Sequence, residues 1–225
     1  MQALAILEPQ TAGLQELLGV FDSMVEEQLE LTRRHRRETR WRQRRPRPRA
    51  IPAALRGVAE RLIVVYGEST GSRERSRAPD RRRLLRWLAI RPATGAKFEQ
   101  VVRSDHVGPD DVQLARVGLT RSELGRGCGL EAFRSRWETF RRPGDVLLAW
   151  NQSSLDLLRG TGLAAEMILL KAVYCNLTQH RCGTLDQVCD AAGLVPSAPR
   201  FSGRGGQRLA QAVAVLDYLR QLALS

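Results

Sequence analysis

Carboxylates and an amide follow two apolar runs of this sequence. Glu68 comes just after the run 61–66, and Asn151 and Asp156 come just after the run 145–150. Carboxylate oxygens that converge on one point are the preferred ligands of Mg²⁺ and Mn²⁺, and paired divalent ions activate water for hydrolysis. The number of acids that these positions supply therefore decides whether metal-dependent chemistry is expected.

Three cysteines and a histidine invite a zinc interpretation. Cys175, His180, Cys182 and Cys189 follow the spacing C-x4-H-x-C-x6-C, which matches no common zinc pattern. Cys189 also falls on the apolar face of a predicted helix, where a thiol is usually part of the core. We therefore expect no zinc site.

The N-terminus lacks a basic start followed by an apolar run, and no apolar stretch approaches the ~20 residues of a membrane span. These features indicate a cytoplasmic protein that contacts no membrane and keeps its thiols reduced.

The net charge of +12 is carried almost entirely by arginine, with lysine only at Lys97 and Lys171. A basic surface concentrates polyanions, of which nucleic acid is the commonest. Because a GC-rich genome also enriches arginine, the clustering of charge is more informative than its total.

The densest cluster is 33–49, in which ten arginines stand against one acid, and the prolines at 46, 48 and 52 exclude a helix. The run is either a solvated linker or an arm whose arginines bind phosphates while an aromatic ring stacks on a base. On the second interpretation, the nucleic-acid-binding residues are Arg33, Arg34, Arg36, Arg37, Arg40, Trp41, Arg42, Arg44, Arg45, Arg47 and Arg49.

Apolar periodicity predicts three regions. Residues 1–32 read as helices with an apolar stripe that must pack on something else, residues 33–58 as a basic linker, and residues 59–223 as an α/β domain. Predicted strands are 61–66, 84–91, 97–102 and 145–150; predicted helices are 110–116, 120–126, 131–141, 152–160, 184–192 and 206–222; 165–173 fits either. This order favours a mixed sheet with helices on its faces.

The polar positions resemble, in order and spacing, those of the DEDD-type 3′–5′ exonucleases. Residues 66–71 (YGESTG) resemble the first motif, D-x-E-T-T-G, and residues 147–158 resemble the second, V-A-H-N-x-x-F-D. Residues 207–214 lie where the third motif, H-x-A-L-x-D-A, would fall, and 117–124 and 183–194 resemble two further family segments. The resemblance implies an RNase H-like fold and a site for two Mg²⁺ or Mn²⁺ ions.

Most residues that carry the family's chemistry are replaced. The remnant motif positions are Tyr66, Glu68, Asn151, Leu155, Asp156, Gly206 and Gln211. Tyr66, Leu155 and Gln211 stand at aspartate positions, Gly206 stands at the general-base histidine, and Asp156 is one residue out of register. One or two carboxylates should not hold a metal pair. We therefore expect no catalytic residue, with Glu68 acting as a capping or hydrogen-bonding acid after its strand and with Asn151 and Asp156 capping the helix that starts near 152.

Residues 2–32 resemble the C-terminal helices of DTW-domain proteins, which are tRNA-uridine aminocarboxypropyltransferases. The resemblance implies that this chain is the C-terminal portion of a longer protein whose upstream core uses S-adenosylmethionine. The chain itself has no Asp-Thr-Trp motif and no candidate S-adenosylmethionine loop. The alternative is a helix pair that packs on the exonuclease-like domain.

Three functions remain open from the sequence. The favoured one is a non-catalytic accessory domain that binds RNA, and tRNA in particular, beside a DTW-type core. The second is an active metal-dependent 3′–5′ exonuclease with rearranged carboxylates, and the third is a protein-interaction module. No cofactor is expected in this chain, and the sequence gives no indication of its oligomeric state.

Overall fold

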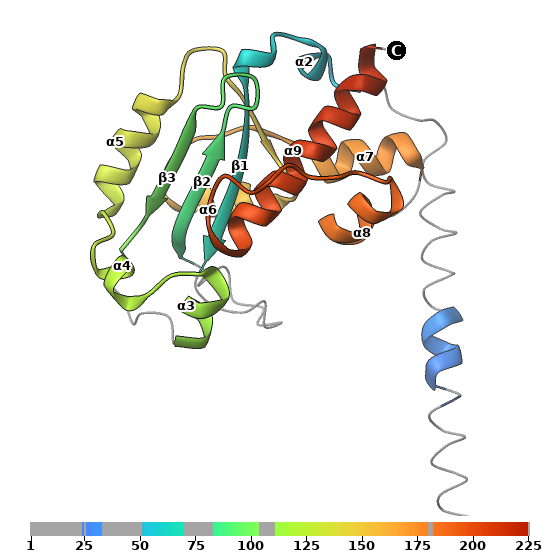
Figure 1. The fold of residues 1–225 in the computed structure, drawn as a ribbon, viewed down its shortest axis with the longest axis horizontal. Helices are drawn as coiled ribbons and strands as arrows, with labels where there is room; N and C mark the ends of the chain where they lie inside the picture. The colour runs from blue at the N-terminus through green and yellow to red at the C-terminus, as the bar shows by residue number, and fades with distance from the viewer. Residues whose placement is uncertain are drawn as a thin grey trace, which may run out of the picture. The chain divides into compact units, whose positions relative to one another are not determined.

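The computed structural model describes residues 24, 26–32, 51–69, 83–103, 111–179 and 182–224. The chain divides into two compact units, and the unit formed by Arg49–Thr178 and Cys182–Ser225 contains the sheet and all labelled helices. This unit is an α/β domain, as predicted (Figure 1). Among the described helices, none is long and apolar enough to span a membrane.

The sheet has five strands in the order β3-β2-β1-β4-β5. β1 pairs antiparallel with β2, and β2 pairs antiparallel with β3, whereas β1–β4 and β4–β5 are parallel. The mixed sheet confirms the predicted fold class. The strands are β1 (Leu62–Ser69), β2 (Leu84–Ile90), β3 (Lys97–Val101), β4 (Val146–Ala149) and β5 (Met167–Leu169).

The helices follow the predicted segments closely, and the ambiguous segment 165–173 contains the strand β5 followed directly by α7. Thr120 and Thr184 begin their helices with complete capping boxes, which satisfy backbone donors at both starts. The helices are α2 (Ala53–Arg56), the 3₁₀ turn η1 (Ala59–Arg61), α3 (Asp111–Val117), α4 (Arg121–Gly125), α5 (Leu130–Phe140), α6 (Gln152–Gly160), α7 (Leu170–Thr178), α8 (Leu185–Ala191) and α9 (Gly203–Leu224).

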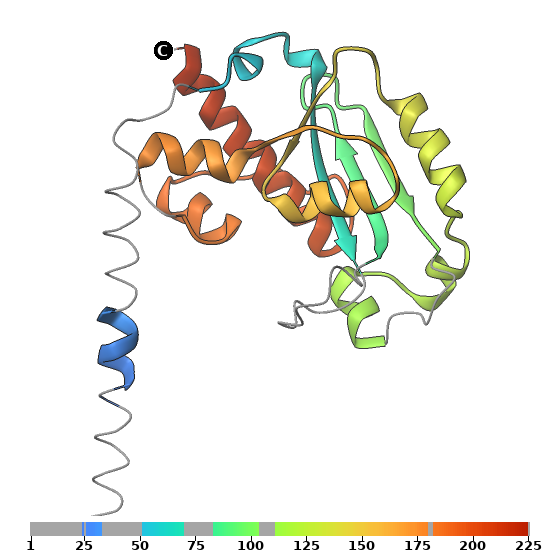
Figure 2. The same ribbon diagram turned by 180° about the vertical axis from the view of Figure 1, so that it is seen from behind.

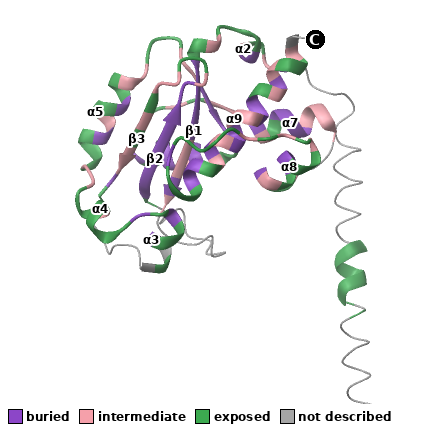
Figure 3. Cartoon of the chain, in the orientation of Figure 1, coloured by how far each residue is buried: buried purple, intermediate pink, exposed green. Residues whose placement is uncertain are grey.

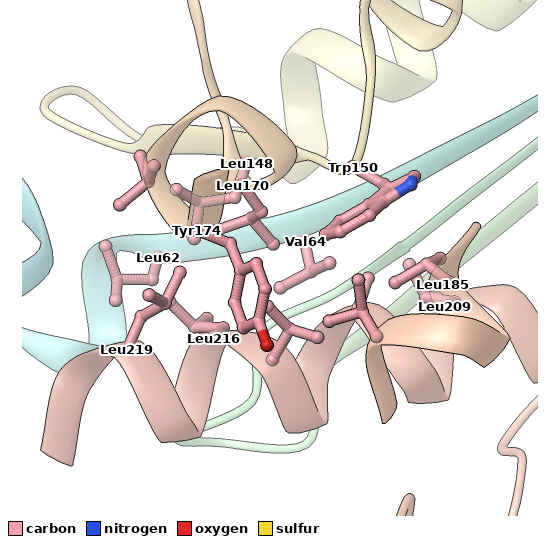
Figure 4. Packing of buried hydrophobic residues seen from close by; sticks show 14 of the residues in the cluster. Leu62, Val64, Leu148, Trp150, Leu170, Tyr174, Leu185, Leu209, Leu216 and Leu219 are labelled. Atoms are coloured by element: carbon pink, nitrogen blue, oxygen red, sulfur yellow. The ribbon is translucent and has the colours of Figure 1, made fainter. Parts of the chain in front are cut away.

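Helices cover both faces of the sheet, which explains why its central strands are apolar at consecutive positions. On one face, Leu62 and Val64 of β1 pack in a cluster with residues of α7, α8 and α9 (Figure 4). On the other face, Ile63 and Val65 pack with residues of α5 and α6. Figure 2 shows α6 in front of the sheet on this side. The carboxyl end of β1 therefore emerges between two layers of helices.

The folded domain begins before residue 59, although the prolines there favour a linker. Ile51 is 8% exposed, Leu55 is fully buried, and both belong to the cluster that includes α9. Residues 51–58 are thus part of the domain, because apolar side chains on the short helix α2 complete its core. The predicted basic linker, 33–58, therefore extends too far, because residues 51–58 belong to the folded domain.

The apolar stripe predicted over 1–32 is described only at its end. Residues 26–32 are helical, which agrees with the prediction for this stretch. Met24 is 60% exposed and Leu29 is 48% exposed (Figure 3). In this described stretch the stripe is therefore exposed, and the rest of 1–32 lies outside the described residues.

Candidate functional site

Tyr66 and Glu68 are alternate residues near the carboxyl end of β1, so both side chains lie on the α9 face of the sheet. Glu68 is 5% exposed and stands opposite Arg86 of β2 in the strand register. Its Oε2 lies 3.8 Å from Arg86 Nη1, and its carboxylate accepts a hydrogen bond from the backbone N–H of Gly205. Glu68 therefore acts as a hydrogen-bonding acid after β1, as the sequence predicts, and its partner is the first turn of α9.

Burial has the largest effect on the pKa values of Tyr66 and Glu68. Desolvation raises the pKa of Glu68 to about 7, against the attraction of Arg86 and Arg204 and the Gly205 hydrogen bond. Burial also raises the pKa of Tyr66, and the nearby Glu68 charge adds to this effect. Oε2 of Glu68 is buried without a hydrogen-bond partner among the described residues. Glu68 is thus poised between its protonated and ionised forms near neutral pH.

Arg86 is the main cation beside Glu68, and its side chain is 1% exposed. Its Nε donates to Glu99 Oε1 at 2.9 Å, and its Nη1 donates to the carbonyl oxygen of Ser202 at 3.1 Å and to that of Val117 at 3.4 Å. Arg86 thereby joins β2 to β3, to the residues before α9 and to the end of α3. Sequence reasoning missed this residue, although an arginine inside an apolar strand was a visible signal.

The second-motif positions lie at the start of α6. Asn151 is its N-cap, and its Oδ1 accepts a hydrogen bond from the Ser153 N–H at 3.2 Å, as predicted. Leu155 is 6% exposed, so an apolar side chain stands at this aspartate position. Asp156 lies inside the helix and does not cap it; its Oδ1 accepts from Gln152 Nε2 at 2.8 Å.

Gly206 occupies the position of the family's general-base histidine, and the space beside it is filled by backbone. A Cβ atom there would lie 1.9 Å from the carbonyl oxygen of Phe201. Any side chain would therefore force the segment before α9 to move. A histidine is excluded from this position by packing as well as by sequence.

Gln211, at the third aspartate position, links α9 to α8. Its Nε2 donates to Asp186 Oδ1 at 2.7 Å, while Arg208 Nη2 lies 2.7 Å from Asp186 Oδ2. The Gln211 hydrogen bond and the Arg208 charge hold the pKa of Asp186 below its ordinary value, with burial opposing them. Gln211 thus has a structural partner that orients it toward α8.

The donor set does not fit a pair of divalent ions. The carboxylates of Glu68, Asp156 and Asp186 are paired with Arg86, Gln152 and Arg208 respectively. The described ranges contain no group of three or more histidine, cysteine, aspartate or glutamate side chains that could hold a metal ion. Oε2 of Glu68 accepts no hydrogen bond from the described residues and offers one metal ligand, but hard cations need several.

Positive charge surrounds the remnant motif positions. Arg116, Arg204 and Arg208 all act electrostatically on Tyr66, and each opposes the rise in its pKa. Arg116 and Arg204 are exposed, and Arg208 is half-buried. Among the described residues, the surface beside the carboxyl end of β1 is therefore rich in arginine, which favours an anionic ligand.

Several predicted residues are not tested by this geometry. The whole arginine run 33–49, including Trp41, lies outside the described residues, as does His180. Cys189 is buried in the core, as predicted. The expectation of reduced thiols is wrong for two cysteines, because Cys175 and Cys182 are joined by a disulfide between α7 and the segment before α8.

No family model matches this chain, and no curated protein matches it. Several solved structures, by contrast, do match this chain. A full-length 3′-exonuclease superposes with a TM-score of 0.57 and 13% identity, covering 72% of this chain and 82% of its own.

Two further structures are similar. A 3′-exonuclease described in 3′-end-specific recognition of a histone mRNA stem-loop has a TM-score of 0.54 and 13% identity, over 72% of this chain and 80% of its own. Exonuclease X, in complex with 5′-overhanging duplex DNA, has a TM-score of 0.52 and 12% identity, over 73% of this chain and 93% of its own.

These similarities define the class of the domain: it has the RNase H-like α/β fold of 3′-exonucleases, as the motif order predicts. Within that class, Tyr66, Leu155, Gln211 and Gly206 stand in this chain where the resemblance leads one to expect three aspartates and a histidine, and arginines lie near Tyr66. Identity of 12–13% fixes the fold, and function has to be argued from the site.

Proposed function

We propose that this domain binds nucleic acid, and RNA in particular, through an exonuclease-like cleft without hydrolysing it. The observation that carries the proposal is the pairing of Glu68 with the buried guanidinium of Arg86, at 3.8 Å. A fixed organic cation beside the retained glutamate leaves too few free carboxylates to assemble a metal pair.

The charges around the cleft support an anionic ligand. Arg116 and Arg204 are exposed near Tyr66, so their guanidinium groups are available to phosphate oxygens. Each phosphate contact of this kind contributes to affinity by releasing counterions, which makes binding salt-dependent. Two of the similar structures concern nucleic-acid complexes, by their own descriptions.

The test compares two arginine pairs. We expect Arg116→Ala/Arg204→Ala to weaken binding of a fluorescent single-stranded RNA and to reduce the slope of log K against log salt by about 2. The matched control is Arg61→Ala/Arg142→Ala, which removes the same charge from exposed positions that precede β1 and β4, at the opposite ends of those strands from Glu68. Equal loss of affinity in both variants would mean that the cleft is not the binding surface.

A residual nuclease is the second candidate, because the buried Oε2 of Glu68 has no hydrogen-bond partner among the described residues. The measurement is digestion of end-labelled RNA and DNA with Mg²⁺ or Mn²⁺. We expect none above a buffer control. Metal-dependent digestion that Glu68→Gln abolishes would replace the non-catalytic proposal with this one.

The identity of the RNA and of any larger parent is a proposal from the sequence. The DTW-like resemblance lies in residues 2–32, and tRNA is the ligand that it implies. An in-frame Asp-Thr-Trp motif upstream of Met1 would support a parent tRNA-uridine aminocarboxypropyltransferase, with S-adenosylmethionine bound by that upstream core. Binding of tRNA no tighter than of unrelated RNA at equal length would count against tRNA as the ligand.

A further inference from the structure

A cavity of about 300 Å³ lies between α9, the segment 197–201 and the turn that joins β2 to β3. This volume is at the lower end of the ~300–1,000 Å³ that small-molecule sites occupy. Apolar and polar groups line it in about equal measure, and the apolar part is formed by Leu62 and Ile90 of the sheet with Phe201, Leu209, Val213 and Leu216 of α9 and the segment before it.

Small residues keep this cavity open. Ala93, Ser197, Ala198 and Ala210 line it, and none of their side chains is long enough to fill the space. Gly206 lets the Phe201 backbone pack directly on α9, which fixes the outer wall. The cavity is therefore a consequence of side-chain size at defined positions.

The polar groups of the cavity are charged. Arg200, Asp217 and Arg220 line it. The Nη1 atom of Arg220 is buried and has no hydrogen-bond partner in the described part of the chain. A buried guanidinium donor without an acceptor is costly, and a carboxylate acceptor would remove that cost. Asp217 lies three residues earlier on α9, and no ion pair joins it to Arg220 among the described residues.

We propose that this cavity binds a small amphipathic monocarboxylate, whose apolar body packs against Leu62, Ile90 and α9 while its carboxylate accepts from Arg220. A single negative charge fits better than a phosphate dianion, because Asp217 already brings negative charge to the same wall. The cavity shares Gly206 with the remnant motif positions, but its charged groups are Arg200, Asp217 and Arg220, and the proposal does not depend on nucleic-acid binding.

The first experiment compares octanoate with octanol, which share a chain length and differ in charge. Isothermal titration of the full chain is expected to show millimolar or tighter binding of octanoate, and binding of octanol that is weaker by about ten-fold, the size of one charge-assisted hydrogen bond. Equal affinity for the two probes, or no octanoate binding at millimolar concentration, would overturn the proposal.

Three substitutions locate the site. Arg220→Gln is expected to lower octanoate affinity to that of octanol, whereas Asp217→Asn is expected to raise it several-fold, because it removes a like charge. Ala198→Trp, at an exposed lining position, is expected to block both probes. Circular dichroism confirms folding of each variant. Octanoate binding that is unchanged by Ala198→Trp in a folded variant would place the octanoate site outside this cavity and refute the proposal.

Discussion

Two opposing effects act on Glu68, and their balance sets how this residue behaves. Burial disfavours its charge, whereas Arg86 at 3.8 Å and the Gly205 N–H favour it. Burial wins, since the pKa is raised to about 7.

This shift makes stability depend on pH. The pKa of Glu68 is raised from 4.5 to about 7, so the folded state holds the proton more tightly than the unfolded state does. The contribution of Glu68 to stability is therefore fully present below pH ~4.5 and is lost as the pH rises through ~7, a loss of about 3 kcal/mol. Glu68→Gln is expected to remove this decline, measured by urea unfolding at pH 5 and pH 8. The exposed Glu131→Gln serves as control and should retain the decline.

Gly206 should tolerate no side chain. Because a Cβ would lie 1.9 Å from the Phe201 carbonyl oxygen, we expect Gly206→Ala to lower the free energy of unfolding by about 3 kcal/mol through overpacking. Gly160→Ala is the matched control, since its Cβ would meet no atom within 4 Å. It should be neutral or slightly stabilising. Similar stability of the two variants would show that the segment before α9 can move away from the added Cβ at little cost in free energy.

At the scale of elements, a buried ion pair holds β2 to the start of β4. Arg91 and Asp145 are each 1% exposed, and Arg91 also donates to the carbonyl oxygens of Phe140 and Glu60, at 3.0 and 3.1 Å. The guanidinium is thus shared among three chain segments that meet at the amino end of β1. Its partner Asp145 supplies the compensating charge in an apolar setting.

Removing one partner should leave that charge buried and uncompensated. Asp145→Ala is expected to lower the free energy of unfolding by about 3–5 kcal/mol. The double variant Arg91→Met/Asp145→Leu should lose much less, because it removes both charges and fills the space with apolar atoms. Chemical denaturation measures both. A double variant that is as unstable as the single one would argue that the Arg91 backbone contacts, and not the ion pair, hold these elements together.

Much of the element layout could be predicted from the sequence, because strands covered on both faces must be apolar throughout. The runs that became β1, β2 and β4 are such cases. Residues 165–173 resisted prediction because β5 passes into α7 without a turn, so that both periodicities overlap. The helix α2 was missed because it is only four residues long and its contribution is one buried Leu55.

The candidate site could be predicted only in part. Motif order located Tyr66, Glu68 and Asn151. The capping role of Asn151 follows from local chemistry, whereas the partner of Glu68, the Gly205 N–H, comes from a distant segment. The role of Arg86 could not be derived, because its partners Glu99 and Ser202 come from distant segments that only the fold brings together. The disulfide between Cys175 and Cys182 likewise depends on where α7 ends, which their spacing does not fix.

At the scale of the whole molecule, arginines are dense in the run 33–49 and also lie near Tyr66, at Arg116, Arg204 and Arg208. If both bind one RNA, charge reversal of Arg42, Arg44 and Arg45 is expected to weaken binding and to lower its salt dependence further, independently of Arg116 and Arg204. Filter binding at several salt concentrations measures both effects. RNA affinity that is unchanged by these substitutions would indicate that the run 33–49 is a linker and not an RNA-binding arm.

The buried Arg86 guanidinium limits how this domain could be engineered into a metalloenzyme. It is anchored by β3, by the end of α3 and by the residues before α9, so it cannot swing aside. A metal site built around Glu68 would have to compete with this resident cation. Its design would therefore have to begin by replacing Arg86 and repacking the three elements that anchor it.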